Sequence, residues 1–154
     1  MQFGRYEALF RVAKGGMAEV FAGRIRAEGG FERLVAIKRI LPHLADDERF
    51  VSMFLEEARL AAAVSSSHVV PTLDLGRDGD GNPYIVLQLV VGASLAQLMQ
   101  RAAVEGHRIP IPVALEILAQ TAIGLHHAHE AHTSAWEPLE LAHRDVSPQN
   151  VLLG

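Results

Sequence analysis

The alternation of apolar and polar positions predicts that the first half of the chain is mainly β-structure. Five short apolar segments are bounded by glycine, proline, aspartate or serine residues, which favour turns. The third segment is a β-branched run that contains a single lysine, a composition typical of a buried strand. These patterns predict strands at residues 5–13, 18–27, 34–40, 69–77 and 84–90.

Three further segments carry apolar residues at helical spacing. The first lies between the third and fourth strands and is expected to run from an N-cap at Asp46 to about Val64. The second covers about residues 95–105. The third opens at Pro110 and Pro112, where proline suits a first helical turn. Because this third helix is apolar around most of its circumference, we expect it to be well buried.

Composition narrows the class of protein. The chain has 154 residues, 49% of them apolar, which fits one ordinary globular domain. Its net charge of −4 gives no basic footprint for nucleic acid or an anionic membrane. The absence of cysteine excludes a disulfide scaffold and a thiolate metal site. No secretion signal is visible, and the most apolar stretch, residues 84–99, is too short and polar to span a bilayer. We therefore expect a soluble, cytoplasmic chain without a nucleic-acid partner or membrane segment.

The stretch with the strongest chemical pattern is His143–Asn150, which reads H-R-D-V-S-P-Q-N. An aspartate within hydrogen-bonding reach of a hydroxyl can prepare it to attack a phosphate. The side-chain carbonyl of Asn150 suits magnesium, a hard cation that prefers oxygen ligands. The simpler interpretation is a buried pair of Arg144 and Asp145 in a loop. The choice between them depends on whether the upstream chain supplies the other parts of a phosphate site.

Three upstream features are candidates for those parts, and each also has a structural interpretation. Gly15 and Gly16 would let backbone amides approach phosphate oxygens, but alone they favour a simple hairpin turn. Lys38 is either an edge charge of its strand or a phosphate contact. Glu56 and Glu57 lie in the middle of the first helix, where they could be solvated carboxylates that pair with nearby arginines.

Two other clusters suggest metal sites only weakly. The turn at residues 78–83 superficially resembles a calcium loop, but the ligand spacing and the final glutamate are missing. His126, His127, His129 and His132 end the third helix, and some are three residues apart. No carboxylate cluster accompanies these histidines, so we do not expect a metal there.

Taken in order, the glycine turn, the sequence V-A-I-K ending at Lys38, a helix glutamate and H-R-D-x-x-x-x-N resemble a protein kinase domain. The chain is most similar to the eukaryotic-type serine/threonine kinases of bacteria, from about Gly4 to Gly154. The resemblance implies an α+β, protein-kinase-like fold. Residues 1–91 would form an N-lobe with a five-stranded antiparallel sheet and one helix. Residues 92–154 would form the first helices of an incomplete helical C-lobe that ends just after the catalytic loop.

The resemblance also implies ATP and Mg²⁺ as cofactors and the serine or threonine hydroxyl of a protein as substrate. Asp145 would orient or deprotonate that hydroxyl, and Asn150 would bind magnesium. Lys38 would hold the α- and β-phosphates, and Glu57 would hold Lys38, with Glu56 as the alternative. His143 and Arg144 would be scaffold residues. The implied nucleotide-binding positions are Ala13, Gly15, Gly16, Val20, Ala36, Lys38, Leu87, Gln88 and Val90.

Within that set, the resemblance gives the apolar residues separate places. Val20 and Ala36 would form the roof over the adenine, and Leu87 would lie at the back of its pocket. Gln88 and Val90 would offer backbone hydrogen bonds to the adenine. Such pockets are usually apolar with a few placed polar groups.

The sequence also departs from the kinase pattern. Ala13 and Ala18 replace two glycines, and Ser147 stands where many serine/threonine kinases have a lysine. The chain ends at Gly154 before any D-F-G, so the third helix would expose an apolar face that later helices cover. We expect an ATP-dependent serine/threonine protein kinase, here a truncated domain that is inactive alone. The alternative is a nucleotide-binding pseudokinase or a regulatory interaction module without catalysis.

Overall fold

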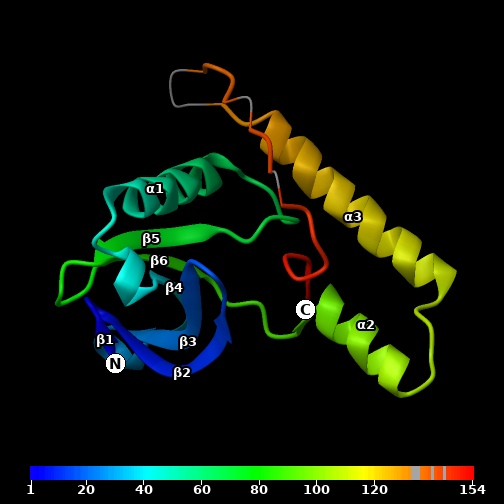
Figure 1. Cartoon of the computed structure of the whole chain (residues 1–154), viewed down its shortest axis with the longest axis horizontal. Coiled ribbons are helices and arrows are strands. Elements are labelled where there is room, and N and C mark those ends of the chain that lie inside the picture. The colour runs from blue at the N-terminus through cyan, green and yellow to red at the C-terminus, as the bar shows by residue number, and fades with distance from the viewer. Residues whose placement is uncertain (133–135, 140, 144) are drawn as a thin grey trace. The chain divides into compact units, whose positions relative to one another are not determined.

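The computed structural model describes residues 1–132, 136–139, 141–143 and 145–154 (Figure 1). The chain forms two compact units. The first unit consists of Met1–Ala62 and Pro71–Leu89, and the second consists of Ala63–Val70 and Val90–Gly154. No helix among the described residues is both long enough and apolar enough to cross a membrane.

The first unit is built on an antiparallel sheet with the strand order β1-β2-β3-β4-β6-β5. The five predicted strands are confirmed. One further strand, β1, was missed because its two residues carry no periodicity; it pairs Phe3 with Tyr6 of β2. The strands are β1 Gln2–Phe3, β2 Tyr6–Lys14, β3 Ala18–Arg26, β4 Glu32–Ile40, β5 Thr72–Arg77 and β6 Pro83–Gln88.

The sheet buries a separate hydrophobic cluster on each face, because side chains alternate along each strand. Val35 and Ile37 of β4 belong to the first cluster, whereas Ile40 belongs to the second. The first cluster also contains Phe3, Tyr6, Ala8, Tyr84 and Val86, and the second contains Ala18, Phe54, Ala58 and Ile85. Lys38 lies on the β4 face opposite to Val35 and Ile37.

The helix α1 (Glu48–Ala63) packs against the sheet through Phe54 and Ala58, which are both buried (Figure 1). Its cap is Asp47, whose Oδ1 accepts a hydrogen bond of 3.0 Å from the N–H of Arg49. The prediction of Asp46 as N-cap was wrong by one residue. The preceding turn continues to Asp47, whose own N–H donates to the carbonyl of Leu44, so the helix begins later.

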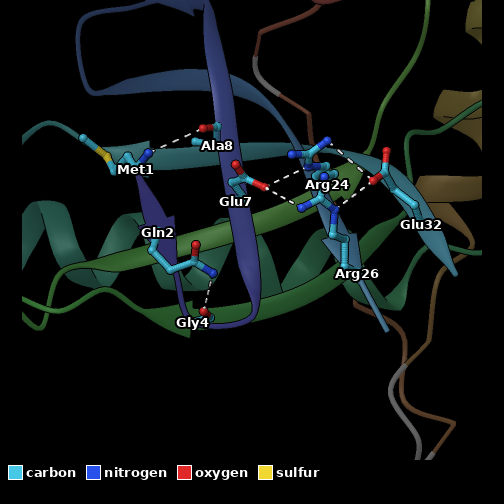
Figure 2. Close-up of polar contacts among 8 residues, drawn as sticks. All are labelled: Met1, Gln2, Gly4, Glu7, Ala8, Arg24, Arg26 and Glu32. Carbon is cyan, nitrogen blue, oxygen red and sulfur yellow. Dashed lines mark hydrogen bonds and ion pairs between the residues drawn. The ribbon is translucent and has the colours of Figure 1, made fainter. Parts of the chain in front are cut away.

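Cross-strand ion pairs fix the register of β2, β3 and β4 on an exposed part of the sheet (Figure 2). Glu7 lies directly opposite Arg24, with 2.8 Å between Oε2 and Nε. Arg26 lies directly opposite Glu32, with 3.0 Å between Nε and Oε2. Diagonal pairs of 3.5 Å (Arg24–Glu32) and 4.0 Å (Arg26–Glu7) join the four side chains. Opposite charges that face each other in this way favour one strand pairing over a slipped one.

The second unit contains α2 (Leu95–Val104), α3 (Ile111–His129) and the short strands β7 (Ala93–Ser94) and β8 (Leu152–Leu153), which pair with each other. Ser94 and Gln97 form a capping box at the start of α2. Gly92 precedes β7 at a place where a Cβ atom would lie 1.8 Å from the carbonyl oxygen of Leu153. Only glycine fits this approach of the two backbones.

The helix α3 is more exposed than its sequence predicts. Among its residues, all of them described, only Gly124 is buried. Ile111, Leu115 and Leu118 are 76%, 60% and 62% exposed. The expectation of a well-buried helix was therefore wrong, because no element among the described residues covers this face. The exposed apolar face that the kinase resemblance implied is present.

Candidate active site

The first unit brings Lys38 of β4 and Glu57 of α1 together. The distance between Lys38 Nζ and Glu57 Oε1 is 2.5 Å, a charge-assisted hydrogen bond. Lys38 Nζ also lies 5.8 Å from the centre of the Phe54 ring, the buried anchor of α1. The packing of α1 on the sheet therefore sets the position of Glu57. Glu56, the alternative partner, instead lines a cavity of about 780 Å³ beside α1 together with Arg59 and Arg77.

The turn between β2 and β3 is closed by a hydrogen bond of 2.8 Å from the N–H of Gly15 to the carbonyl of Ala18. Neither Gly15 nor Gly16 has a positive φ. A Cβ atom at Gly16 would meet nothing within 4 Å, and at Gly15 only the Ala18 oxygen at 3.5 Å. Neither backbone strain nor packing therefore requires glycine at these two positions. Open glycines with free space above them are what a loop over phosphate groups needs.

The two alanines of the glycine turn have different surroundings. Ala18 is buried and belongs to the second hydrophobic cluster with Ile40 and Ile85. Its methyl group therefore contributes to the core of the first unit. Ala13 is exposed, so its methyl group is at the surface of the turn.

The apolar residues expected to contact adenine, Val20, Ala36 and Leu87, share one face of the sheet. Val20 pairs with Lys38 across β3 and β4, and Ala36 pairs with Leu87 across β4 and β6. The N–H of Gln88 donates to the carbonyl of Pro71 at 3.0 Å. A ligand beside Gln88 would therefore use its carbonyl group as acceptor. Val90 belongs to the second unit.

The second unit brings Asp145 and Asn150 together. Asn150 Nδ2 donates to Asp145 Oδ2 at 2.8 Å and to the Asp145 carbonyl at 3.1 Å. Both side chains are exposed. These two bonds use the amide nitrogen of Asn150, and its side-chain oxygen is a separate acceptor group. The alternative of a buried pair of Arg144 and Asp145 involves Arg144, which lies outside the described residues.

Backbone hydrogen bonds hold this loop. The N–H of Asp145 donates to the carbonyl of His143 (2.8 Å), and the N–H of Asn150 donates to the carbonyl of Ser147 (2.9 Å). The first two amides of α2 donate to loop carbonyls, Leu95 to Val151 at 2.8 Å and Ala96 to Pro148 at 2.9 Å. The loop thereby supplies hydrogen-bond acceptors to backbone amides that have no partner within the helix itself.

The two weak metal candidates have other hydrogen-bond partners. Asp78 Oδ1 accepts hydrogen bonds from the N–H of Asp80 (3.0 Å) and from that of Asn82 (2.9 Å). These bonds close the turn that the sequence predicts at residues 78–83. His127 Nδ1 lies 2.8 Å from Ser66 Oγ, and His132 Nδ1 lies 2.6 Å from the Glu130 carbonyl. Within the described part of the chain, no three His, Asp or Glu side chains are grouped to hold a metal ion.

One charged pair close to these residues was not predicted from the sequence. Glu19 is buried, with 6% of the residue exposed, and its Oε1 accepts a hydrogen bond of 2.9 Å from Arg39 Nη2. The two residues are direct partners across β3 and β4. The signal for this pair is two opposite charges at matching positions of adjacent strands, which becomes visible only when the register is known.

Comparisons with known proteins agree with the fold. The family model for protein tyrosine and serine/threonine kinases matches residues 7–154. The chain belongs to the protein kinase family.

The tyrosine-protein kinase MasK of Myxococcus xanthus is 41% identical over 151 residues, which are 98% of this chain and 23% of MasK. The serine/threonine-protein kinase PknE of Mycobacterium tuberculosis is 34% identical over 152 residues, 99% of this chain and 24% of PknE. The crystal structure of the M. tuberculosis PknI kinase domain has a TM-score of 0.74 and 29% identity, and the match covers 99% of this chain and 57% of that one. This chain thus spans about a quarter of the curated relatives.

Proposed function

We propose that this chain is the nucleotide-binding and catalytic-loop part of an ATP-dependent protein kinase, which transfers a phosphoryl group from ATP to a protein hydroxyl. The observation that carries the proposal is the bond between Lys38 and Glu57. A lysine on a buried strand that is held by a helix carboxylate, beside an open glycine turn, is suited to bind polyphosphate.

In the first unit, Lys38 would contact the α- and β-phosphates while Glu57 keeps its ammonium group in place. Gly15 and Gly16, with Ala13 beside them, would cover the phosphates. Val20, Ala36 and Leu87 would contact the adenine, and Gln88 would bind it through its backbone. Val90, a residue of the second unit, would do the same. The apolar and polar groups of this set fit an adenine nucleotide, since the sheet face offers small or branched side chains and a single ammonium group.

In the second unit, Asp145 would orient the acceptor hydroxyl and accept its proton. Asn150 would bind Mg²⁺ through its side-chain oxygen, which its hydrogen bonds to Asp145 leave available. The chemistry that magnesium would supply there is neutralisation of negative charge on the phosphates. A hard cation fits Asn150 because its side chain offers an amide oxygen atom.

The 154 residues alone would bind nucleotide but transfer little or no phosphate. The sequence contains no D-F-G, the motif whose aspartate is a magnesium ligand in protein kinases. Ser147 also offers no ammonium group where many serine/threonine kinases have a lysine. We expect Asp145→Asn to abolish transfer in the complete protein, and full activity of that variant would remove Asp145 from its assigned role.

For the acceptor, a serine or threonine hydroxyl is the leading candidate, because PknE and several other relatives are named serine/threonine kinases. A tyrosine hydroxyl is the second candidate, because MasK, at 41% identity, is named a tyrosine kinase. Phosphoamino-acid analysis of a mixed peptide library after incubation with the complete protein separates the two. Phosphotyrosine alone would overturn the first candidate.

A nucleotide-binding module without catalysis is the alternative function, favoured by Ser147 in place of a lysine. Titration of this chain with Mg-ATP, followed by thermal unfolding, tests the part that both functions share, because a ligand raises the melting temperature by mass action. We expect a saturable increase for the wild type and none for Lys38→Met. An unchanged melting temperature of the wild type at millimolar Mg-ATP would contradict both functions.

A further inference from the structure

Glu19 and Arg39 form one of the two most deeply buried ion pairs among the described residues, and the shorter of the two. Their side chains are 9% and 14% exposed, and 2.9 Å separates Glu19 Oε1 from Arg39 Nη2. Removal of two charges from water has a large cost, and a hydrophobic pair of similar size is often as stable or more stable. Stabilisation of the sheet alone therefore does not account for this pair.

The pair lies next to both the glycine turn and Lys38. Glu19 directly follows Ala18, the last residue of the glycine turn, and Arg39 directly follows Lys38. The next pair in the same ladder is Val20 with Lys38. Since side chains alternate along a strand, the ion pair lies on the opposite face of the sheet from Lys38. The ion pair joins β3, which begins at the turn, to β4, which carries Lys38. It does so from the face of the sheet opposite to the one proposed to bind nucleotide.

Further contacts extend this connection to both sides. Arg11 of β2 lies 3.6 Å from Glu19, so both strands that flank the turn meet at this carboxylate. Arg39 lies 4.0 Å from Asp78 and 5.8 Å from the centre of the Phe3 ring. The Nε atom of Arg39 is buried without a hydrogen-bond partner, a cost that the other contacts of this side chain must offset.

The tip of the turn has few other supports. Gly15 and Gly16 are exposed, and a Cβ atom at Gly16 would touch nothing within 4 Å. The turn is held at its base by the ladder, by a hydrogen bond of 2.9 Å from the N–H of Leu41 to the carbonyl of Met17, and by the ion pair. The ion pair is the charged side-chain contact between β3 and β4 there, beside the apolar packing of Ala18 in one cluster with Ile40.

We infer that Glu19 and Arg39 are positioning residues that fix the glycine turn relative to Lys38 and thereby set the affinity for the phosphate groups of the nucleotide. Neither residue touches the ligand in this account. The inference rests on the proposed function, and it goes further by assigning a role in phosphate binding to the back of the sheet. It predicts that loss of the pair weakens binding of phosphates but not of adenosine.

The test compares Glu19→Gln with a matched control, Glu7→Gln. The control also breaks a cross-strand ion pair that reaches β3, the 2.8 Å bond of Glu7 with Arg24 (Figure 2). That pair lies at the other end of the β2–β3 ladder from the glycine turn. Calorimetry gives the dissociation constants for Mg-ATP and adenosine. We expect Glu19→Gln to weaken Mg-ATP binding about tenfold, since misplacement of binding groups is costly, and to leave adenosine binding unchanged. Glu7→Gln should change neither constant.

Arg39→Lys provides a conservative variant, because it keeps the charge beside Glu19 but loses the planar fork of the guanidinium group. We expect the Mg-ATP affinity of Arg39→Lys to lie between that of the wild type and that of Glu19→Gln. If Glu19→Gln lowered the affinities for Mg-ATP and adenosine by the same factor, or changed neither, the pair would be structural only and the inference would be overturned.

Hydrogen exchange without nucleotide separates failure of this inference from failure of the proposed function. The amides of residues 15–19 should exchange faster in Glu19→Gln than in the wild type, and Glu7→Gln should leave them unchanged. If the wild type bound neither ligand, the proposed function would fail, and the link to phosphate affinity with it. Unchanged exchange at residues 15–19 would overturn the positioning role in either case.

Discussion

The two units of the chain hold their candidate site residues by different means. The first unit places Lys38 and Glu57 on a sheet and a helix that share two hydrophobic clusters. The second unit places Asp145 and Asn150 in a loop held by backbone hydrogen bonds, beside helices with few buried side chains. Packing thus preorganises the lysine and glutamate, whereas the loop depends on local hydrogen bonds.

Because of this difference, each half of the site is sensitive to a different kind of substitution. Side chains in a close-packed core lose stability when their volume changes, because surrounding atoms relax only partly. A loop that relies on backbone hydrogen bonds is instead sensitive to changes that move the backbone. Substitutions in the two units should therefore differ in how much stability they cost.

Phe54→Ala should cause the largest loss of stability, because Phe54 is 1% exposed and anchors α1 on the sheet. We expect the free energy of unfolding to fall by about 3–5 kcal/mol. Leu115→Ala on α3 is the control; its side chain is 60% exposed, and we expect a change within about 0.5 kcal/mol. Urea unfolding measures both. Equal losses would contradict the difference in packing between the two units.

Gly92→Ala should be the most damaging small change in the second unit. Its Cβ atom would lie 1.8 Å from the carbonyl of Leu153, so β7 and β8 must separate. We expect a loss of about 1–3 kcal/mol, as for other overpacked sites. Gly16→Ala is the control, since its Cβ meets nothing and its φ is not positive. A loss for Gly16→Ala as large as that for Gly92→Ala would show that the steric argument is wrong.

The exposed apolar face of α3 should make the chain associate with itself, because exposed apolar patches mark contact or aggregation sites. Replacement of Leu115 and Leu118 together by lysine should lower the sedimentation coefficient toward that of a monomer at high protein concentration. The melting temperature should change little, since both side chains are exposed. Unchanged association in this variant would contradict the assignment of the self-contact to α3.

A pH dependence of stability should be the smallest effect, and it comes from the first unit. Hydrogen bonds from Tyr6 and then from Arg5 hold the pKa of Asp74 below its usual value. The bond from Arg24 does the same for the pKa of Glu7. A carboxyl group with a lowered pKa in the folded state stabilises the fold above its unfolded pKa, and this stability is lost as the pH falls through the folded pKa.

Stability should therefore fall as the pH decreases below about 4, the usual pKa of these groups. Asp74→Asn should make this fall less steep, and Asp80→Asn, which changes an exposed turn residue, is the control. Thermal unfolding between about pH 3 and pH 6 measures the slopes. The same slope for Asp74→Asn and the wild type would remove Asp74 from this account.

Much of the fold could be predicted from the sequence because it depends on periodic patterns. The five strands and the three helices follow from apolar spacing. The two-residue strand β1 could not be predicted, since its pairing depends on Tyr6 and on the positive φ of Gly4. The true cap at Asp47 differs from the predicted Asp46 because turn hydrogen bonds decide where the helix begins.

The candidate site could be predicted only in part, and for a physical reason. The motif around Lys38 and the one around Asp145 are short and local, so sequence alone identifies them. Contacts between distant segments depend on strand register and packing. For that reason the buried pair of Glu19 and Arg39 was missed, and the bond of the Gln88 N–H to Pro71 was not foreseen. The exposure of α3 was misjudged because its apolar circumference does not reveal what covers it.

The central claim is that Lys38, held by Glu57, binds the phosphates of a nucleotide. The most direct test is calorimetric titration of the chain with Mg-ATP in the wild type, Glu57→Gln and Glu56→Gln, two neighbouring substitutions that remove the same charge from α1. We expect Glu57→Gln to weaken binding about tenfold, because Lys38 loses its charged partner. Glu56→Gln should bind within about twofold of the wild type. Equal affinities of the two variants would contradict the assignment of Lys38 and Glu57 to the nucleotide site.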